Sequence, residues 1–480
     1  MAYIKGASRE QVMLFPDSID EYVTEDNPIR FVDAFVENLD MNELGFQKAK
    51  PAATGRPGYC PKDLLKLYIY GYKNRITSSR NLEKETIRNM EVIWLVKNLK
   101  PDFKTISDFR KENKNSFKKV FKKFTIVCNA LNLFSGELVA IDGTKIKAVN
   151  SLKKNYSEAI LKKKLKDIDE RIDRYLNDIE NNDEKEKDVK NPNAKELQKK
   201  IKSLKLRKKE YEEIEKKLKK SGDSQISLTD PDSRAYPRKF GVPVGYNAQI
   251  AVDDKNHLIV TQDVTNAVTD IEQLSIMAKE AKKELGVEEL KVCADAGYCS
   301  SMEITTCEKA GIEAYTPKIN TSTNSKKGLY TKDMFKFDLN KNCYYCPAGK
   351  EMPYKFTRLE EQRRKKKRVV IYYISESCHI CTQRHLCTES KNQRRISRCP
   401  EEDAIDRMNE RMKQNPEIIK KRKEIVEHVF GTIKFWNYQN RFLTRGLEKV
   451  KGEFSLSALA YNMKRVLNII GTKQLIEALA

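Results

Sequence analysis

Two short, largely apolar segments that each end on an aspartate constrain the fold of this chain more than any other feature. Residues 138–141 precede Asp142, and residues 290–294 precede Asp295. A short apolar run bounded by a turn-forming residue is typical of a buried strand. Between the two, apolar and polar residues alternate over residues 245–266 around a turn, which predicts a β-hairpin. These strands place part of the chain in the α/β class.

Helices are expected around these strands. Thr269 or Asp270, together with Gln273, forms a capping-box start for a helix that follows the hairpin. Near the C-terminus, apolar residues recur at helical spacing over residues 417–436, and Glu427 lies among them. Upstream of the strands, the chain shows only helical patterns, over residues 61–72, 79–97 and 105–133. Their scattered basic residues fit a helix-turn-helix DNA reader and any other helical bundle equally well.

Residues 152–222 differ in composition from the rest, because Lys and Glu dominate them. Apolar residues there step by three and four in two seams, separated by a break at Asn191 and Pro192. This pattern predicts an antiparallel coiled-coil hairpin inserted into the domain. With the hairpin set aside, the order of elements is strand, hairpin, helix, strand and late helix. That is the order of a ribonuclease-H-like α/β domain.

Asp142, Asp295 and Glu427 occupy the three positions at which such a domain gathers acidic residues. Neighbouring carboxylates repel one another unless a cation lies among them, and oxygen ligands suit Mg²⁺ or Mn²⁺. Two such ions about 4 Å apart assist an in-line phosphoryl displacement by activating the nucleophile and stabilising the leaving oxygen. The trio therefore predicts nuclease or strand-transfer chemistry. Glu424, one turn earlier, is the alternative third carboxylate.

The charge of the chain indicates what kind of partner it binds. Lys and Arg total 92 against 69 Asp and Glu, a formal net charge of +23 over 480 residues. A large polyanion such as double-stranded DNA is the expected partner. No apolar stretch is long enough to cross a bilayer and no secretory signal begins the sequence, so we expect a cytoplasmic protein.

Six of the 11 cysteines fall between residues 343 and 399. Cys343 and Cys346 form one CxxC pair, and Cys378 and Cys381 form another, which is typical of a tetrahedral thiolate Zn²⁺ site. Cys387 is an alternate ligand, and an iron–sulfur cluster or a redox pair stays open. The remaining cysteines are expected to be small buried apolar residues: Cys60, Cys128, Cys293, Cys299 and Cys307.

The same stretch contains six consecutive basic residues. Such a run is either a solvated surface or, beside a site that holds DNA, a clamp on the phosphate backbone. We interpret it as DNA-binding: Arg363, Arg364, Lys365, Lys366, Lys367 and Arg368.

Several segments resemble the signature blocks of bacterial insertion-sequence transposases of the DDE type. They are VAIDGTKIKAVNS around Asp142, GYNAQIAVD in the hairpin, CADAGYCS around Asp295 and EIVEHVFGTIK around Glu427. Further segments resemble the N-terminal domain and the C-terminal helix of these proteins: GRPGYCPKDLLKLYIYGYKNRITSSRNLE, PDFKTISDFRKEN and NRFLTRGLEKVKGEFSLSALAYNMKRVLN.

The resemblance implies that Asp142, Asp295 and Glu427 bind the catalytic metal ions, and that Lys434 contacts DNA near the cut. Lys420 and Lys423 stand where related transposases place a tyrosine and an arginine. The implied function is binding of the terminal inverted repeats of a mobile element, followed by metal-dependent cleavage and strand transfer by a homodimer assembled on DNA. A catalytically inactive DNA-binding relative and a metal-dependent nuclease without strand transfer are the alternatives.

The expected organisation is an all-α N-terminal domain that binds DNA ends, an α/β catalytic core and two insertions. Their boundaries are 1–135 for the N-terminal domain, 136–151 with 223–318 and 400–470 for the core, 152–222 for the coiled-coil hairpin, and 319–399 for the cysteine-rich, basic, zinc-binding insertion.

Overall fold

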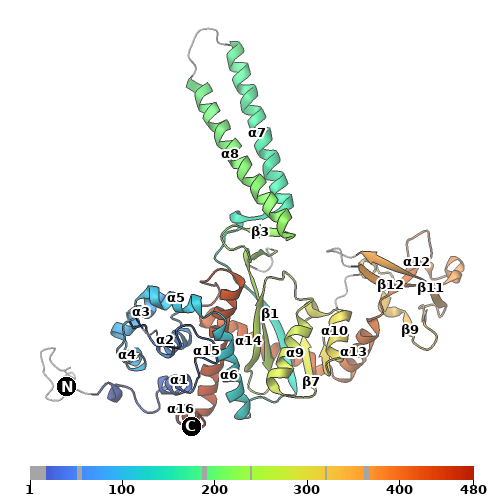
Figure 1. Ribbon diagram of the computed structural model, residues 1–480. Coiled ribbons are helices and arrows are strands. Elements are labelled where there is room, and N and C mark those ends of the chain that lie inside the picture. Colours follow the sequence, from blue (N-terminus) through green and yellow to red (C-terminus); the bar gives the residue numbers. More distant parts are fainter. Residues whose placement is uncertain are drawn as a thin grey trace, which may run out of the picture.

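The protein is a mixed α/β protein, and its structure is a computed structural model that describes residues 18–50, 54, 57–185, 192–237, 241–318, 322–361 and 367–479. Figure 1 shows a central sheet that lies between a group of N-terminal helices and a smaller β-rich insertion, with a long helical arm projecting from it. The helices that are described are all too short or too polar to span a bilayer.

The elements follow one another in a mixed order. The helices are α1 (Pro28–Glu37), α2 (Pro61–Lys73), α3 (Ser79–Arg88), α4 (Met90–Leu95), α5 (Phe103–Glu112), α6 (Ser116–Ala130), α7 (Glu158–Lys185), α8 (Pro192–Ser221), α9 (Leu274–Leu285), α10 (Ser301–Glu308), α11 (Thr323–Lys326), α12 (Arg384–Cys387), α13 (Glu402–Gln414), α14 (Pro416–Gly431), α15 (Leu447–Ile470) and α16 (Thr472–Glu477). The strands are β1 (Leu138–Lys147), β2 (Asn155–Ser157), β3 (Gln225–Ser227), β4 (Arg234–Ala235), β5 (Val244–Asp253), β6 (Ile259–Thr265), β7 (Leu290–Ala294), β8 (Ile312–Tyr315), β9 (Lys336–Asp338), β10 (Cys343–Tyr345), β11 (Glu351–Glu361), β12 (Lys367–Ile374) and β13 (Arg395–Arg398).

The central sheet has six strands in the order β4-β5-β1-β7-β8, with β6 also paired to β5. β1 is antiparallel to β5 and parallel to β7, and β7 is parallel to β8. Every residue of β5 is buried. The helices α9 and α14 both pack against β1 and β5, and they account for this burial.

β1 differs from the predicted strand at its end. The sequence predicts a strand that stops at residue 141, whereas β1 continues to Lys147 because β5 pairs with it along its whole length. β7 pairs only with the first part of β1, and its last residue Ala294 lies opposite Ile141. Asp142 therefore lies inside a strand, at the point where the parallel neighbour ends.

Three predicted helices also begin or break elsewhere. The helix expected over residues 79–97 is interrupted at Asn89, whose side chain caps α4 by accepting a hydrogen bond from Val92 N. The helix expected over residues 105–133 is divided into α5 and α6. The capping box at Asp270 is wrong, since α9 begins at Leu274 with no side-chain cap.

The arm consists of α7 and α8, which lie side by side in Figure 1. Near its base, Leu161 packs with Ile214 and Leu218, and farther out Ile168 and Ile172 pack with Ile201. These contacts come from both predicted seams, so the helical hairpin is present. Its supercoiling as a coiled coil stays a prediction.

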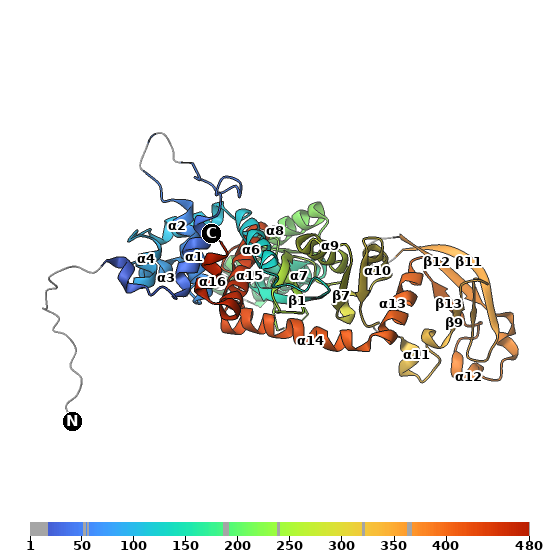
Figure 2. The ribbon, with the colours of Figure 1, turned by 90° about the horizontal axis from the view of Figure 1, so that it is seen from below.

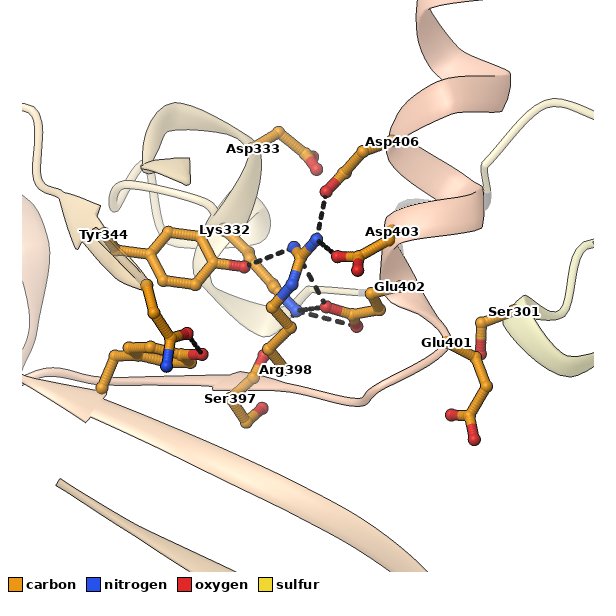
Figure 3. A network of polar contacts seen from close by, with 12 residues as sticks. Ser301, Lys332, Asp333, Tyr344, Ser397, Arg398, Glu401, Glu402, Asp403 and Asp406 are labelled. Atoms are coloured by element: carbon orange, nitrogen blue, oxygen red, sulfur yellow. Dashed lines mark hydrogen bonds and ion pairs between the residues drawn. The ribbon is translucent and has the colours of Figure 1, made fainter. Parts of the chain in front are cut away.

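The insertion contains a five-stranded sheet in the order β13-β12-β11-β10-β9. Arg398, at the end of β13, connects it to α13 in the network of Figure 3. Its Nη2 lies 2.5 Å from Asp403 and 2.6 Å from Asp406, and its Nη1 donates to Tyr344 Oη at 3.1 Å. Lys332 reinforces the junction through an ion pair with Glu402 at 2.7 Å.

Arg398→Gln should loosen this junction without unfolding the central sheet. The loss of a buried, multiply bonded guanidinium costs about 1–3 kcal/mol, limited because both aspartates are half-exposed and regain water. Native-state hydrogen exchange should show faster exchange in β13 and α13. Lys413→Gln, which breaks an exposed pair with Glu410, is the control and should leave exchange unchanged. Equal exchange in the two variants would contradict the assignment.

Candidate active site

Asp142 and Asp295 lie side by side on neighbouring parallel strands. Ile141 is in register with Ala294, so the next residue of each strand is one of the two aspartates. Asp142 Oδ1 accepts a hydrogen bond from Gly143 N at 2.7 Å. Asp295 begins a short 3₁₀ helix, and its Oδ1 accepts from Gly297 N at 2.7 Å. Parallel pairing thus brings together two carboxylates that are far apart in the sequence.

The environment of Asp142 disfavours its negative charge. Burial raises the pKa of Asp142 to about 6, and the carboxylates of Asp295 and Asp270 act in the same direction. The Gly143 amide and the Arg422 guanidinium oppose this shift. Asp142 and Asp295 therefore form a pair of hard oxygen donors that a divalent cation would stabilise.

Arg422 is the residue of α14 that reaches this group. Its Nη1 lies 3.3 Å from Asp142 Oδ2, and both side chains are largely buried. The sequence places Arg422 next to Lys420 and Lys423, which are both exposed. An arginine one position away from the expected spacing thus makes the contact with the carboxylate.

A buried polar network lies beside the two aspartates. Asp270 accepts hydrogen bonds from Lys145 Nζ at 3.0 Å, Asn247 Nδ2 at 2.6 Å and Gln249 Nε2 at 2.8 Å. Tyr298 Oη donates to Gln249 Oε1 at 2.5 Å. The network joins β1, β5 and the turn after β7, so it holds in place the backbone that carries Asp142 and Asp295.

Asp270 is the member of this network that sequence reasoning missed. The sequence predicts Asp270 as a helix cap, whereas its carboxylate accepts hydrogen bonds from side chains of the sheet. The sequence feature that could have revealed this network is the pair Asn247 and Gln249, two amides on the same face of a largely apolar strand. Buried amides require partners, and a nearby carboxylate is a suitable one.

Gly143 leaves the space that this network occupies. A Cβ there would overlap Gln249 Nε2 and lie 2.8 Å from Tyr298 Oη. Gly143→Ala should therefore displace the network and lower the thermal unfolding midpoint, at a cost of about 1–3 kcal/mol from overpacking. Gly58→Ala is the matched control, since a Cβ there meets nothing within 4 Å. Equal melting temperatures for the two variants would show that the space is not needed.

Glu427 lies on α14, the helix that runs along one side of the sheet in Figure 2. It is exposed, as is Glu424, and it makes no hydrogen bond or ion pair with any residue that the structure describes. On the same helix and the turn that follows it, Arg422 and Lys434 both contact β1. Glu427 is therefore placed between two residues that reach the site, whereas its own carboxylate points to solvent.

Within the described residues, no three His, Cys, Asp or Glu side chains stand together closely enough to hold a metal ion. Asp142 and Asp295 still offer the carboxylate oxygens that Mg²⁺ and Mn²⁺ prefer, in a pair whose charge is incompletely balanced by Arg422. These two residues therefore fit a divalent ion.

Lys434 lies in a π-helical segment, Thr432–Trp436, that continues α14. Its Nζ donates to Thr144 Oγ1 at 2.6 Å, and burial lowers its pKa. Thr144 is two residues beyond Asp142 on β1, so both side chains are on the same face of the strand. The lysine ammonium therefore lies beside the carboxylate site.

The basic run is only partly described. Arg363, Arg364, Lys365 and Lys366 lie outside the described residues. Lys367 is exposed at the start of β12, whereas Arg368 donates to Ser301 Oγ at 2.5 Å and faces Glu401 at 3.8 Å. Arg368 therefore connects the insertion to α10.

The cysteines differ from the predicted set in one member. Cys346, Cys378 and Cys381 line one small cavity together with Cys387, and Cys343 does not line it. Among the isolated cysteines, Cys128, Cys293 and Cys307 are buried as expected, Cys299 is half-buried and Cys60 is exposed.

Two family descriptions match the chain. Residues 345–467 match "Transposase DDE domain", and residues 17–112 match "Transposase domain (DUF772)". The first match contains Glu427 and Lys434, and the second covers the helices from α1 to α5. A search of the curated proteins found no match. Among solved structures, the "Cryo-EM structure of piggyBac transposase synaptic complex with hairpin DNA (SNHP)" is similar at 10% identity, covering 95% of this chain and 79% of that chain, with a TM-score of 0.31, which is too low to support an argument.

Proposed function

Because the chain belongs to the DDE-type transposases of insertion sequences, we propose that it binds the terminal inverted repeats of its element and catalyses DNA cleavage and strand transfer there. Asp142, Asp295 and Glu427 form the proposed catalytic triad. The observation that carries the proposal is the parallel pairing of Ile141 with Ala294, which makes the residues that follow them, Asp142 and Asp295, neighbours.

We propose a ribonuclease-H-like core for the same reason. In chain order, β1 is central, β5 and then β6 lie on one side, and β7 and then β8 lie on the other. Three antiparallel strands followed by two parallel ones, with acidic residues on the first and fourth, support this assignment. The proposed domain boundaries are those predicted from the sequence, with residues 1–135 binding the DNA ends.

Two Mg²⁺ or Mn²⁺ ions are the proposed catalytic cofactors, and when bound they supply nucleophile activation and stabilisation of the leaving oxygen. Asp142 and Asp295 would hold them, with Glu427 added from α14. Arg422 now neutralises Asp142 Oδ2, so it must yield that oxygen to a cation. The zinc predicted for the insertion is a separate cofactor, remote from these carboxylates in sequence.

Lys434 is the proposed contact for a DNA phosphate near the cut. Its ammonium sits beside Thr144, and it has no carboxylate partner among the described residues. The exposed Lys367 and the rest of the basic run are the proposed clamp on the DNA backbone. The helical arm and a homodimer that bridges two DNA ends complete the proposal, which places the protein at the nucleoid of the bacterial cytoplasm.

A labelled duplex that carries one element end, taken from the inverted repeats flanking the gene, tests the triad. Asp142→Asn, Asp295→Asn and Glu427→Gln should each bind this duplex as the wild type does. Each should cut and join it at least about 100-fold more slowly in Mg²⁺ or Mn²⁺, because a charged metal ligand is lost. Gel-resolved rates of cleavage and joining give the measurement.

Glu424→Gln is the matched control on the same helix and should keep the wild-type rate. If Glu424→Gln is inactive and Glu427→Gln active, the third carboxylate is Glu424. Equal cutting of a scrambled duplex would favour a nuclease without strand transfer. Binding without any cutting by the wild type would favour an inactive DNA-binding relative.

Lys434→Gln should weaken binding of the element end and reduce its dependence on salt. The removal of one phosphate contact lowers the slope of log K against log salt concentration by about 0.9. Fluorescence anisotropy over a salt series measures the slope. Lys163→Gln, which changes an exposed residue of α7 in the arm, is the comparison variant. The assignment fails if the two variants have the same slope as the wild type.

A further inference from the structure

The cysteine-rich insertion brings four thiols to one small cavity. Cys346, Cys378, Cys381 and Cys387 line a space of about 30 Å³, which is enough for one small ion or one water molecule. Four thiols are the number that a closed tetrahedral zinc site requires.

The local backbone explains why these four meet. Cys378 lies in the 3₁₀ helix Glu376–Ile380, and Cys381 is three residues further on, so the two side chains are on the same side of the turn. Cys387 ends the short helix α12. Cys346 begins a turn after β10, closed by a hydrogen bond from Gly349 N to Cys346 O at 2.8 Å.

The same geometry removes Cys343 from the set. Cys343 is the first residue of the extended strand β10 and does not line the cavity, whereas Cys346 lies just past the end of that strand and does. Its neighbours on the adjoining strands are Asp338 and Pro353, to which it is paired in register. The first CxxC motif therefore does not act as a pair, and Cys387 takes the place of Cys343.

Charge and packing around the cavity favour a bound metal. Four thiolates with one Zn²⁺ carry a net double negative charge, and Arg384 and Arg394 are among the residues that line the same cavity. The apolar core of the insertion is small: Phe335, Tyr344, Met352, Tyr373 and Ile396. Cys346 and Cys387 pack against it. A small domain with so few buried apolar residues is of the kind that a structural metal stabilises.

The geometry points to a structural zinc site formed by Cys346, Cys378, Cys381 and Cys387, with Cys343 excluded. As they stand, the four thiols line one cavity but are not close enough together to hold a metal ion. Binding therefore requires them to close on the ion by rotation about their χ1 angles. The site holds the turns that carry Cys346, Cys378 and Cys387 against the small core. Its formation is independent of the proposed DNA chemistry.

Zinc content of the full-length protein tests the assignment. The protein is purified without a metal-binding tag and dialysed against EDTA to strip weak carboxylate sites, and metals are then measured by mass spectrometry. We expect one zinc ion per chain in the wild type, near-complete loss in Cys387→Ser, and retention in Cys343→Ser and Cys343→Ala. Asp142→Asn should keep its zinc, which separates this site from the catalytic one.

Cobalt substitution gives a second measurement. The wild type and the Cys343 variants should show the thiolate-to-cobalt charge-transfer bands of tetrahedral coordination, and Cys387→Ser should lose intensity. Wild-type protein without zinc, or with iron and sulfide instead, overturns the metal assignment. Loss of zinc in both Cys343 variants, with retention in Cys387→Ser, overturns the ligand set. Neither result changes the expected outcome of the cleavage assay, so the zinc site and the proposed function are tested separately.

Discussion

The parallel pairing of β1 with β7 is the constraint on which the candidate active site depends. It places Ile141 opposite Ala294, and Asp142 and Asp295 follow as neighbours. The two carboxylates repel each other, and burial adds to the cost, so that the pKa of Asp142 is raised to about 6. The strands stay in register because their apolar residues are buried on both faces of the sheet. Packing of the core therefore imposes the proximity of the two charges.

The rest of the molecule supports this arrangement from several directions. The network of Asp270, Asn247, Gln249 and Tyr298 fixes the backbone beside the aspartates through buried hydrogen bonds. α15 joins the N-terminal helices to the sheet, and its Asn462 bonds both the N–H and the C=O of Ile259 at 2.8 and 2.7 Å. This amide acts as a strand partner at the beginning of β6, where the edge of the sheet would otherwise be open.

The sequence predicted the elements that carry local patterns. The hairpin of β5 and β6, the helical hairpin of α7 and α8 and the helix α14 follow from apolar periodicity of two or near three and a half, and the strand β7 follows from a short apolar run. Wrong boundaries arose where a tertiary partner intervened. β5 extends β1 past residue 141, and the sheet takes the Asp270 carboxylate away from the helix that it was expected to cap. The motif CxxC was ambiguous for a related reason, because its spacing brings two thiols together on a turn and separates them on a strand.

The sequence by itself determined the resemblance to DDE-type transposases, the mixed α/β class and the aspartates that directly follow two short apolar segments, because residue types and local spacing specify each of these. Only the tertiary structure decided that Arg422 is the cation on Asp142, that Asp270 joins the site and that Cys387 meets Cys346. These contacts depend on strand register, helix placement and side-chain direction. All three are settled by packing between segments that are distant in the chain, and no local pattern records that packing.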